Sequence, residues 1–173
     1  MLVRLLYASR AVDDVSQEEL MTILSQSKAR NPASGITGVL CSSGRLFLQL
    51  LEGGRMQVNA LYNQIAADAR HKDVVILSYE EISERRFAHW SMGLVNLERV
   101  NTSLLLKYSE SAVLDPYGVS GAASMALLGE LMATASVQGI KVDLPKASAS
   151  QSLVQPKTIA LTVNNQGQIF MDA

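Results

Sequence analysis

The stretch from Gly35 to Gly54 constrains the fold most, because two apolar runs in it flank Ser42-Ser43-Gly44. Two such runs separated by a short serine-glycine segment are typical of a β-hairpin. Strand side chains alternate between two faces, so Gln49 is expected to share a face with Phe47 and Leu51. A carboxamide buried there without hydrogen-bond partners costs about 1–3 kcal/mol. Gln49 is therefore either satisfied locally or contacts a ligand held over the sheet.

The rest of the first hundred residues predicts an α+β fold of the ferredoxin-like type. A helix is expected after Ser16, because Ser16 and Glu19 have the spacing of a capping box. Two crossover helices would cover one face of an antiparallel-rich sheet, in the order β-α-β-β-α-β with an extra strand. The expected strands are residues 2–9, 36–40, 45–51, 73–81 and 86–95, and the expected helices are residues 15–27 and 55–70.

From residue 101 the sequence no longer shows the alternation of strands and helices expected for the first hundred residues. Residues 103–108 suit a short strand or a short helix, and residues 120–133 form an apolar helix. A Ser/Ala-rich linker at 145–155 precedes a small hairpin made by residues 157–164 and 168–172. We expect three parts: a sheet domain over 1–97, a C-terminal helical cap over 98–135, and a linker with a hairpin tail over 136–173.

The composition narrows the function classes. The 173 residues carry a formal net charge of -1, which gives no electrostatic indication of a nucleic-acid or membrane partner. Cys41 is the only cysteine, so no internal disulfide forms, and a reducing compartment is expected. No apolar run reaches the roughly 18 residues of a membrane helix. Two histidines without cysteine partners make no metal site, and a cytoplasmic location follows as an expectation.

A candidate ligand site emerges where the expected fold brings polar residues together. The first and third strands are neighbours in this strand order, so Tyr7 and Gln49 would face each other beneath a slot walled by Ile23 and Ile65. The Asn31 loop and the pair Asp68 and Arg70, near the end of the second helix, could complete it. Each residue alone also has an ordinary structural explanation, such as core packing or a turn. Only the joint pattern points to a ligand.

That joint pattern resembles the BLUF family, the blue-light sensors that use flavin. The similarity covers about residues 1–97, and residues 104–131 also look like the C-terminal helical cap of the short, single-domain members. The matching segments are Arg4–Ser9, Asn31-Pro32, Gly35–Gly38, Phe47–Gln49, Leu51–Gly53, Asp68–His71, Phe87 and Trp90–Met92. Arg30 departs from the family pattern, where a smaller polar residue or histidine is common.

The resemblance implies a bound FAD, with FMN as the alternative, and places its ring between the two helices. Tyr7 would be the photochemical electron and proton donor, and Gln49 would relay the proton and then rearrange its amide. Trp90 and Met92, placed on the last strand, would report that rearrangement to the surface. The residues implied to bind the cofactor are Ile23, Ser27, Asn31, Gln49, Ile65, Asp68 and Arg70.

The function implied is that of a non-enzymatic blue-light photoreceptor that signals through protein–protein contacts. No effector domain fits in the remaining residues, so a separate downstream protein and a homo-oligomer are the expected partners. Two alternatives stay open at this point. A flavin-dependent oxidoreductase would need a substrate opening, although no dinucleotide fingerprint or histidine cluster is present. A cofactor-free regulatory interaction domain would follow if each site residue had only its structural role.

The tail shows a second, weaker similarity. Residues 140–149 and 158–172 resemble the start of the periplasmic domain of ExbD/TolR proteins. Those proteins carry a transmembrane helix before this segment, whereas the helix expected here is short and contains Glu130. Their function is therefore not carried over to this chain.

Overall fold

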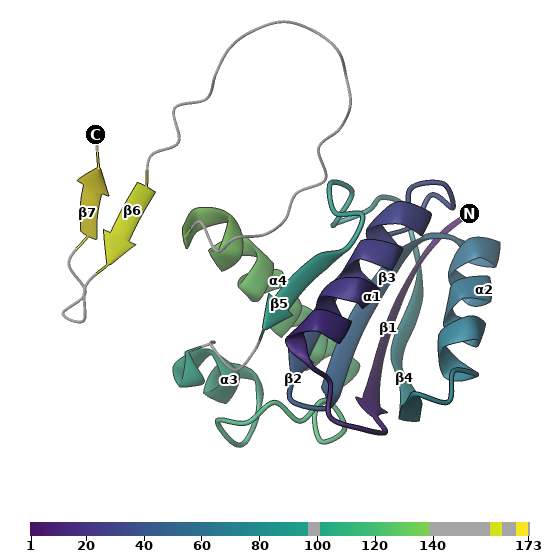
Figure 1. Cartoon of the computed structure of the whole chain (residues 1–173), viewed down its shortest axis with the longest axis horizontal. Coiled ribbons are helices and arrows are strands. Elements are labelled where there is room, and N and C mark those ends of the chain that lie inside the picture. Colours follow the sequence, from purple (N-terminus) through teal and green to yellow (C-terminus); the bar gives the residue numbers. More distant parts are fainter. Residues whose placement is uncertain (97–100, 139–159, 164–168, 173) are drawn as a thin grey trace, which may run out of the picture.

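The computed structural model describes residues 1–96, 101–138, 160–163 and 169–172. Five strands form one sheet in the order β4-β1-β3-β2-β5, as Figure 1 shows. All neighbours are antiparallel except β2 and β5. The strands are β1 (Leu2–Ala11), β2 (Thr37–Ser43), β3 (Leu46–Gly54), β4 (His71–Ile82) and β5 (Gly93–Asn96). The ferredoxin-like α+β prediction is confirmed, and β5 is the extra strand.

Helices α1 (Gln17–Arg30) and α2 (Arg55–Ala66) are the two crossovers and cover one face of the sheet (Figure 1). The predicted capping box starts α1: the Glu19 N–H donates to Ser16 Oγ, and the Ser16 N–H donates to Glu19 Oε2. Helix α2 ends four residues before the predicted boundary. Asp68 causes the stop, since its carboxylate accepts the N–H of Arg70 and stabilises a turn instead of another helical turn.

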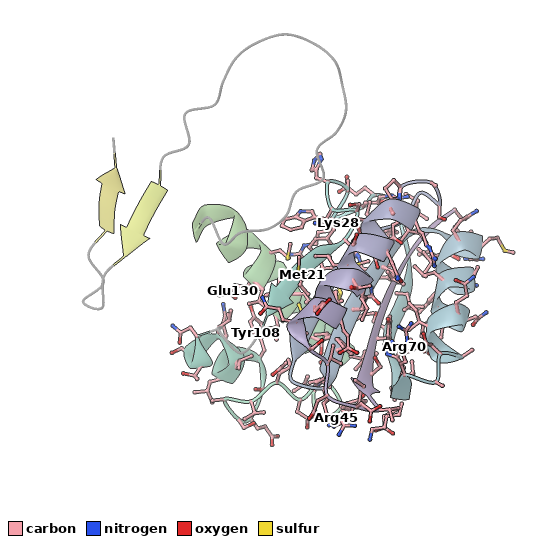
Figure 2. The ribbon with its side chains drawn as sticks, in the orientation of Figure 1. Met21, Lys28, Arg45, Arg70, Tyr108 and Glu130 are labelled. Atoms are coloured by element: carbon pink, nitrogen blue, oxygen red, sulfur yellow. The ribbon has the colours of Figure 1, made fainter. Side chains whose placement is uncertain are left out.

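The opposite face of the sheet is covered by the C-terminal cap, formed by α3 (Thr102–Tyr108) and α4 (Gly121–Gln138). The first of these settles the open choice between strand and helix. Figure 2 shows Tyr108 of α3 beside Glu130 of α4, and the tyrosine hydroxyl donates to the Glu130 carboxylate. Because Gly121 has no side chain, the start of α4 lies directly on the main chain of Leu77 in β4. The predicted helical cap is confirmed.

The alternation of strand side chains produces two separate cores. Phe47 and Leu51 of β3 pack with Tyr7 on the α1/α2 face, as the hairpin pattern predicted. Leu48 and Leu50 pack on the other face against Leu127, Leu128, Leu131 and Met132 of α4. The central strands β1 and β3 are thus buried on both sides, which explains why their sequences are almost continuously apolar.

The predicted strand at 86–95 is wrong over most of its length, because extended pairing covers only β5. Trp90 and Met92 therefore precede the last strand instead of lying on it. The Trp90 N–H donates to the Phe87 carbonyl in a turn, and the Trp90 carbonyl accepts the N–H of Gly38. Main-chain N–H and carbonyl groups of this segment form isolated hydrogen bonds, so they are not available for regular strand pairing.

The tail contains two short antiparallel strands, β6 (Ala160–Val163) and β7 (Ile169–Asp172), within the predicted hairpin. The predicted linker at 145–155 and the hairpin turn lie outside the described residues. Among the helices of the described ranges, none combines the length and the apolar character needed to cross a membrane.

Candidate functional site

A cleft of about 1080 Å³ opens between α1 and α2, with the sheet as its floor. Both walls are partly apolar, and both predicted isoleucines contribute to them. Except for Trp90, every predicted site residue lines this cleft: Tyr7, Ile23, Ser27, Asn31, Gln49, Ile65, Asp68, Arg70 and Met92. The volume is of the size that binds a cofactor or other small molecule.

Three buried side chains form a hydrogen-bonded line on the cleft floor. Tyr7 and Gln49 are direct partners in the β1–β3 register, so their side chains leave the sheet side by side. The Tyr7 hydroxyl donates to Gln49 Oε1, and Gln49 Nε2 lies 3.4 Å from Met92 Sδ. The carboxamide therefore accepts on one side and donates on the other. Its burial is satisfied by these contacts, which answers the question raised by an amide in a core strand.

Tyr7 is held as a neutral phenol. Its side chain is 1% exposed, and burial raises its pKa far above the ordinary value, with a smaller contribution from Tyr62. The two rings are packed edge to face with centroids 5.5 Å apart. Tyr7 consequently keeps its proton in the resting protein and can only donate a hydrogen bond to Gln49.

Asn31 closes the far end of α1 and is buried. Its carbonyl accepts the N–H of Ile36 at 2.9 Å, which fixes the loop into β2. Its side-chain Nδ2 donates to the carbonyl of Ser91 at 2.8 Å. The residue thus joins the cleft wall to the segment that carries Met92, a structural role that sequence reasoning did not anticipate.

Asp68 and Arg70 form an ion pair at the mouth of the cleft, with 2.6 Å between Arg70 Nη2 and Asp68 Oδ2. The side-chain hydrogen bonds from Arg70 hold the pKa of Asp68 well below its ordinary value. The carboxylate and guanidinium are thus both engaged with each other. They lie in the turn after α2, which orients them toward the cleft.

His71 also lines the cleft but received no role from sequence reasoning. Its Nδ1 lies 3.0 Å from Ser9 Oγ, and burial lowers its pKa below the usual value. Ser9 follows Tyr7 by two residues, and this period-two spacing places it on the same face of β1. That spacing was the signal that could have identified the pair.

Trp90 and Met92 lie on opposite sides of the sheet. Met92 belongs to the core under α1 and α2, whereas Trp90 packs against the core under α4. The indole ring fills the space that a side chain at Gly93 would need. Of the two predicted relay residues, Met92 alone contacts the Tyr7–Gln49 line.

The family model described as sensors of blue-light using FAD matches residues 2–93. The chain belongs to the BLUF family. The curated relatives of this BLUF chain include the Blue light- and temperature-regulated antirepressor BluF of Escherichia coli K12, which is 37% identical over 97 residues. Photoactivated adenylate cyclase subunit alpha of Euglena gracilis is 43% identical over 84 residues. These matches cover 56% and 49% of this chain but only 24% and 8% of the relatives.

Solved BLUF structures share the architecture over a larger part of the chain. The dark-state structure of BlrB, a BLUF protein, has a TM-score of 0.65 at 31% identity and covers 78% of this chain and 96% of that chain. The photo-activated state of BlsA has a TM-score of 0.66 at 30% identity, and the match covers 76% of this chain and 95% of the BlsA chain. The similarity of residues 140–149 and 158–172 to ExbD/TolR proteins has no support from these comparisons.

Proposed function

We propose that this BLUF chain binds a flavin between α1 and α2 and signals blue light through the line Tyr7–Gln49–Met92. The observation that carries the proposal is this hydrogen-bonded line, buried on the floor of an otherwise open cleft. Core packing alone does not require a phenol, a carboxamide and a thioether to be joined in space by hydrogen bonds. They suit a site where one buried amide must change its partners.

The residues of the cleft fit a flavin. Ile23 and Ile65 supply apolar walls for a flat ring, and Ser27 and Asn31 offer polar atoms at one side of it. Asp68 and Arg70 would hold the ring edge near the mouth. The family description names FAD, which we take as the cofactor of this chain in preference to FMN.

When bound and excited by blue light, a flavin supplies an oxidant able to take an electron from a phenol. Tyr7 is the proposed donor. Its proton would leave together with the electron, because a buried positive charge would be costly, and Gln49 Oε1, which accepts the hydroxyl hydrogen bond, is placed to relay it. The electron and the proton would later both return to Tyr7. Reversal of the Gln49 amide then turns Nε2 toward Tyr7 and Oε1 toward Met92.

The new arrangement removes the donor that faced Met92 Sδ. An amide oxygen against a thioether sulfur brings two acceptors together, so Met92 is expected to move. Light needs only to bias two arrangements that the same residues can adopt. The proposed output is a change in contacts with a separate protein or with a second copy of the chain. The cytoplasm is the proposed location, and no enzymatic step is assigned to the chain.

An absorption spectrum of the purified protein before and after blue illumination tests the proposal. We expect a bound yellow flavin whose visible band moves to the red in light and returns in the dark. Release of the cofactor by heat, followed by chromatography, separates FAD from FMN. Protein that stays colourless after incubation with either flavin would favour the cofactor-free interaction domain. Steady turnover of a reduced nicotinamide would favour the oxidoreductase.

A further inference from the structure

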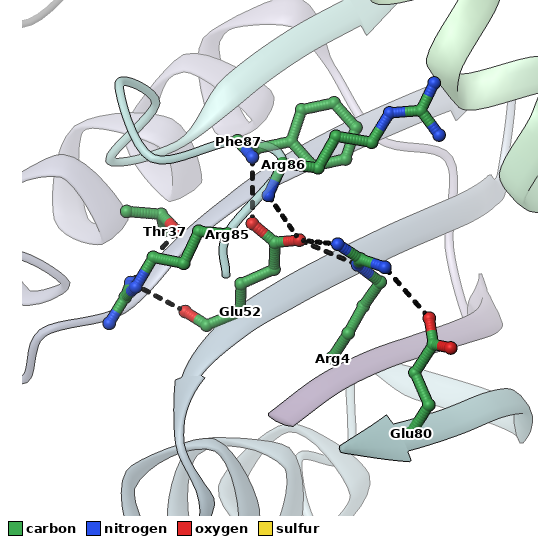
Figure 3. A network of polar contacts seen from close by, with 7 residues as sticks. All are labelled: Arg4, Thr37, Glu52, Glu80, Arg85, Arg86 and Phe87. Atoms are coloured by element: carbon green, nitrogen blue, oxygen red, sulfur yellow. Dashed lines mark hydrogen bonds and ion pairs between the residues drawn. The ribbon is translucent and has the colours of Figure 1, made fainter. Parts of the chain in front are cut away.

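Glu52 is a fully buried carboxylate on the face of the sheet opposite the cleft. It lies on β3 three residues after Gln49, so alternation directs the two side chains to opposite faces. Its Oε1 accepts from Arg4 Nε at 2.7 Å and from the Arg86 N–H at 3.1 Å. Its Oε2 accepts the Phe87 N–H at 2.9 Å, as Figure 3 shows. The charge is therefore paired, and two consecutive main-chain groups are bound to one carboxylate.

The neighbouring residue strengthens this attachment. The Arg85 guanidinium donates to the main-chain carbonyl of Glu52 at 3.1 Å and to Thr37 Oγ1 at 3.0 Å (Figure 3). It also donates to the carbonyl of Gly35 at 2.5 Å. Residues 85–87 are thus fixed to β3 and to the start of β2. The same segment continues to Met92, where it meets Gln49.

The anchored residues also contact the cap. The guanidinium of Arg86 extends toward α4 (Figure 3). It occupies the space beside Gly129, where an added methyl group would overlap it. Gly129 is buried in this contact. Phe87 and Trp90 pack in the core formed with α4. One short segment therefore touches Gln49 at its end and α4 along its course.

We propose that Glu52 is a positioning residue, and that the segment 85–92 it anchors carries the change at Gln49 to α4 through Arg86 and Gly129. This inference rests on the proposed function. A displacement of Met92 in a loose loop would be absorbed locally. Here the main chain is tied at residues 86 and 87, so the displacement is passed to the side chains packed against the cap helix.

Glu52→Gln tests the anchor, with Glu80→Gln as the matched control. Glu80 binds the same arginine, Arg4, but it lies exposed on β4, outside the segment. The glutamine keeps the shape of Glu52 but places an NH₂ group where two N–H donors and a guanidinium require an acceptor. The measurements are the light-induced flavin shift and hydrogen exchange of the α4 amides in dark and light. We expect both variants to keep the red shift, and only Glu52→Gln to lose the light-induced exchange difference in α4.

A folded Glu52→Gln protein that keeps the wild-type exchange difference overturns the inference. So does a wild-type protein that shifts to the red without any exchange difference in α4. If Glu52→Gln does not fold, Gly129→Ala takes its place, since it displaces Arg86 and leaves the Glu52 hydrogen bonds intact. Loss of the light-induced exchange difference in α4 would then support the inference, and a wild-type difference would overturn it. Absence of the red shift in the wild-type protein contradicts the proposed function itself, and this result is distinct from failure of the anchor alone.

Discussion

At the scale of single residues, the site depends on where one proton and one amide lie. Tyr7 is neutral because it is buried, and Gln49 is satisfied because a donor and an acceptor flank it. Both properties come from the packing around the side chains and not from the side chains alone. Two substitutions examine these properties separately.

Tyr7→Phe removes the proton donor and leaves the apolar ring in the core. We expect the variant to bind flavin and to lose the light-induced red shift, which a light-minus-dark spectrum measures. Tyr62→Phe is the control, because Tyr62 packs edge to face on Tyr7 and its own ring stays in place. A Tyr7→Phe protein that switches normally would remove Tyr7 from the mechanism.

Gln49→Leu removes both hydrogen bonds at the centre of the line while preserving the volume of the side chain. The Tyr7 hydroxyl loses its buried acceptor, which costs about 1–3 kcal/mol of unfolding free energy. We expect flavin binding without the red shift, and a lower denaturant midpoint. An unchanged light response in this variant would show that the amide does not carry the switch.

His71 provides a pH dependence with a definite sign. Burial lowers its pKa in the folded protein, so the folded state binds fewer protons than the unfolded chain. Its contribution to stability is present above the unfolded pKa of about 6.5 and is lost as the pH falls toward the folded pKa. In flavin-free protein, His71→Gln should therefore lose less unfolding free energy than wild type between neutral and mildly acidic pH. Parallel pH curves for the two proteins would contradict this assignment.

At the scale of elements, helix starts and strand faces were predictable because they are encoded locally. The capping box at Ser16 and the alternation along β3 depend on residues two or three positions apart. The segment 83–92 was not predictable in this way. Its path is set by partners far along the chain, such as Glu52, Gly38 and Asn31. Residues 86–95 contain Phe87, Trp90 and Met92, and these large apolar side chains look like those of a strand when the partners are unknown.

Ser16→Ala measures the local contribution at the start of α1. Loss of the cap leaves the Glu19 N–H without its side-chain acceptor, and the expected cost is about 0.5–2 kcal/mol of unfolding free energy. Ser25→Ala is a suitable control, because Ser25 is exposed inside the same helix. Denaturant curves compare the two proteins. Equal midpoints would show that the cap contributes nothing beyond what tertiary packing supplies.

At the scale of the whole molecule, one sheet separates a cleft from a helical cap. The two cores share the central strands β1 and β3, so side chains on both faces are attached to the same two backbone segments. Under the inference drawn above, a small rearrangement over one face would be detected on the other. This two-core arrangement also makes the cap part of the folded unit, because α4 completes a core.

Leu128→Ala tests that last point, since Leu128 is fully buried between α4 and the sheet. The cavity it leaves should cost about 2–5 kcal/mol of unfolding free energy. Leu106 lies on the exposed side of α3, so Leu106→Ala should change the free energy of unfolding by no more than about 0.5 kcal/mol. Both values come from denaturant unfolding. Similar small effects in the two variants would mean that the cap is not part of the cooperative core.

The sequence by itself determined the fold class, the pairing of the first and third strands and several residues of the cleft. These follow from hydrophobic periodicity, turn residues and motif spacing, which are short-range properties of the chain. Only the tertiary structure decided that Met92 faces the cleft and Trp90 the cap, and that Glu52 holds residues 86 and 87. The physical reason is that hydrogen bonds and packing between residues 30 to 60 positions apart fix these features, and no local pattern encodes such pairs.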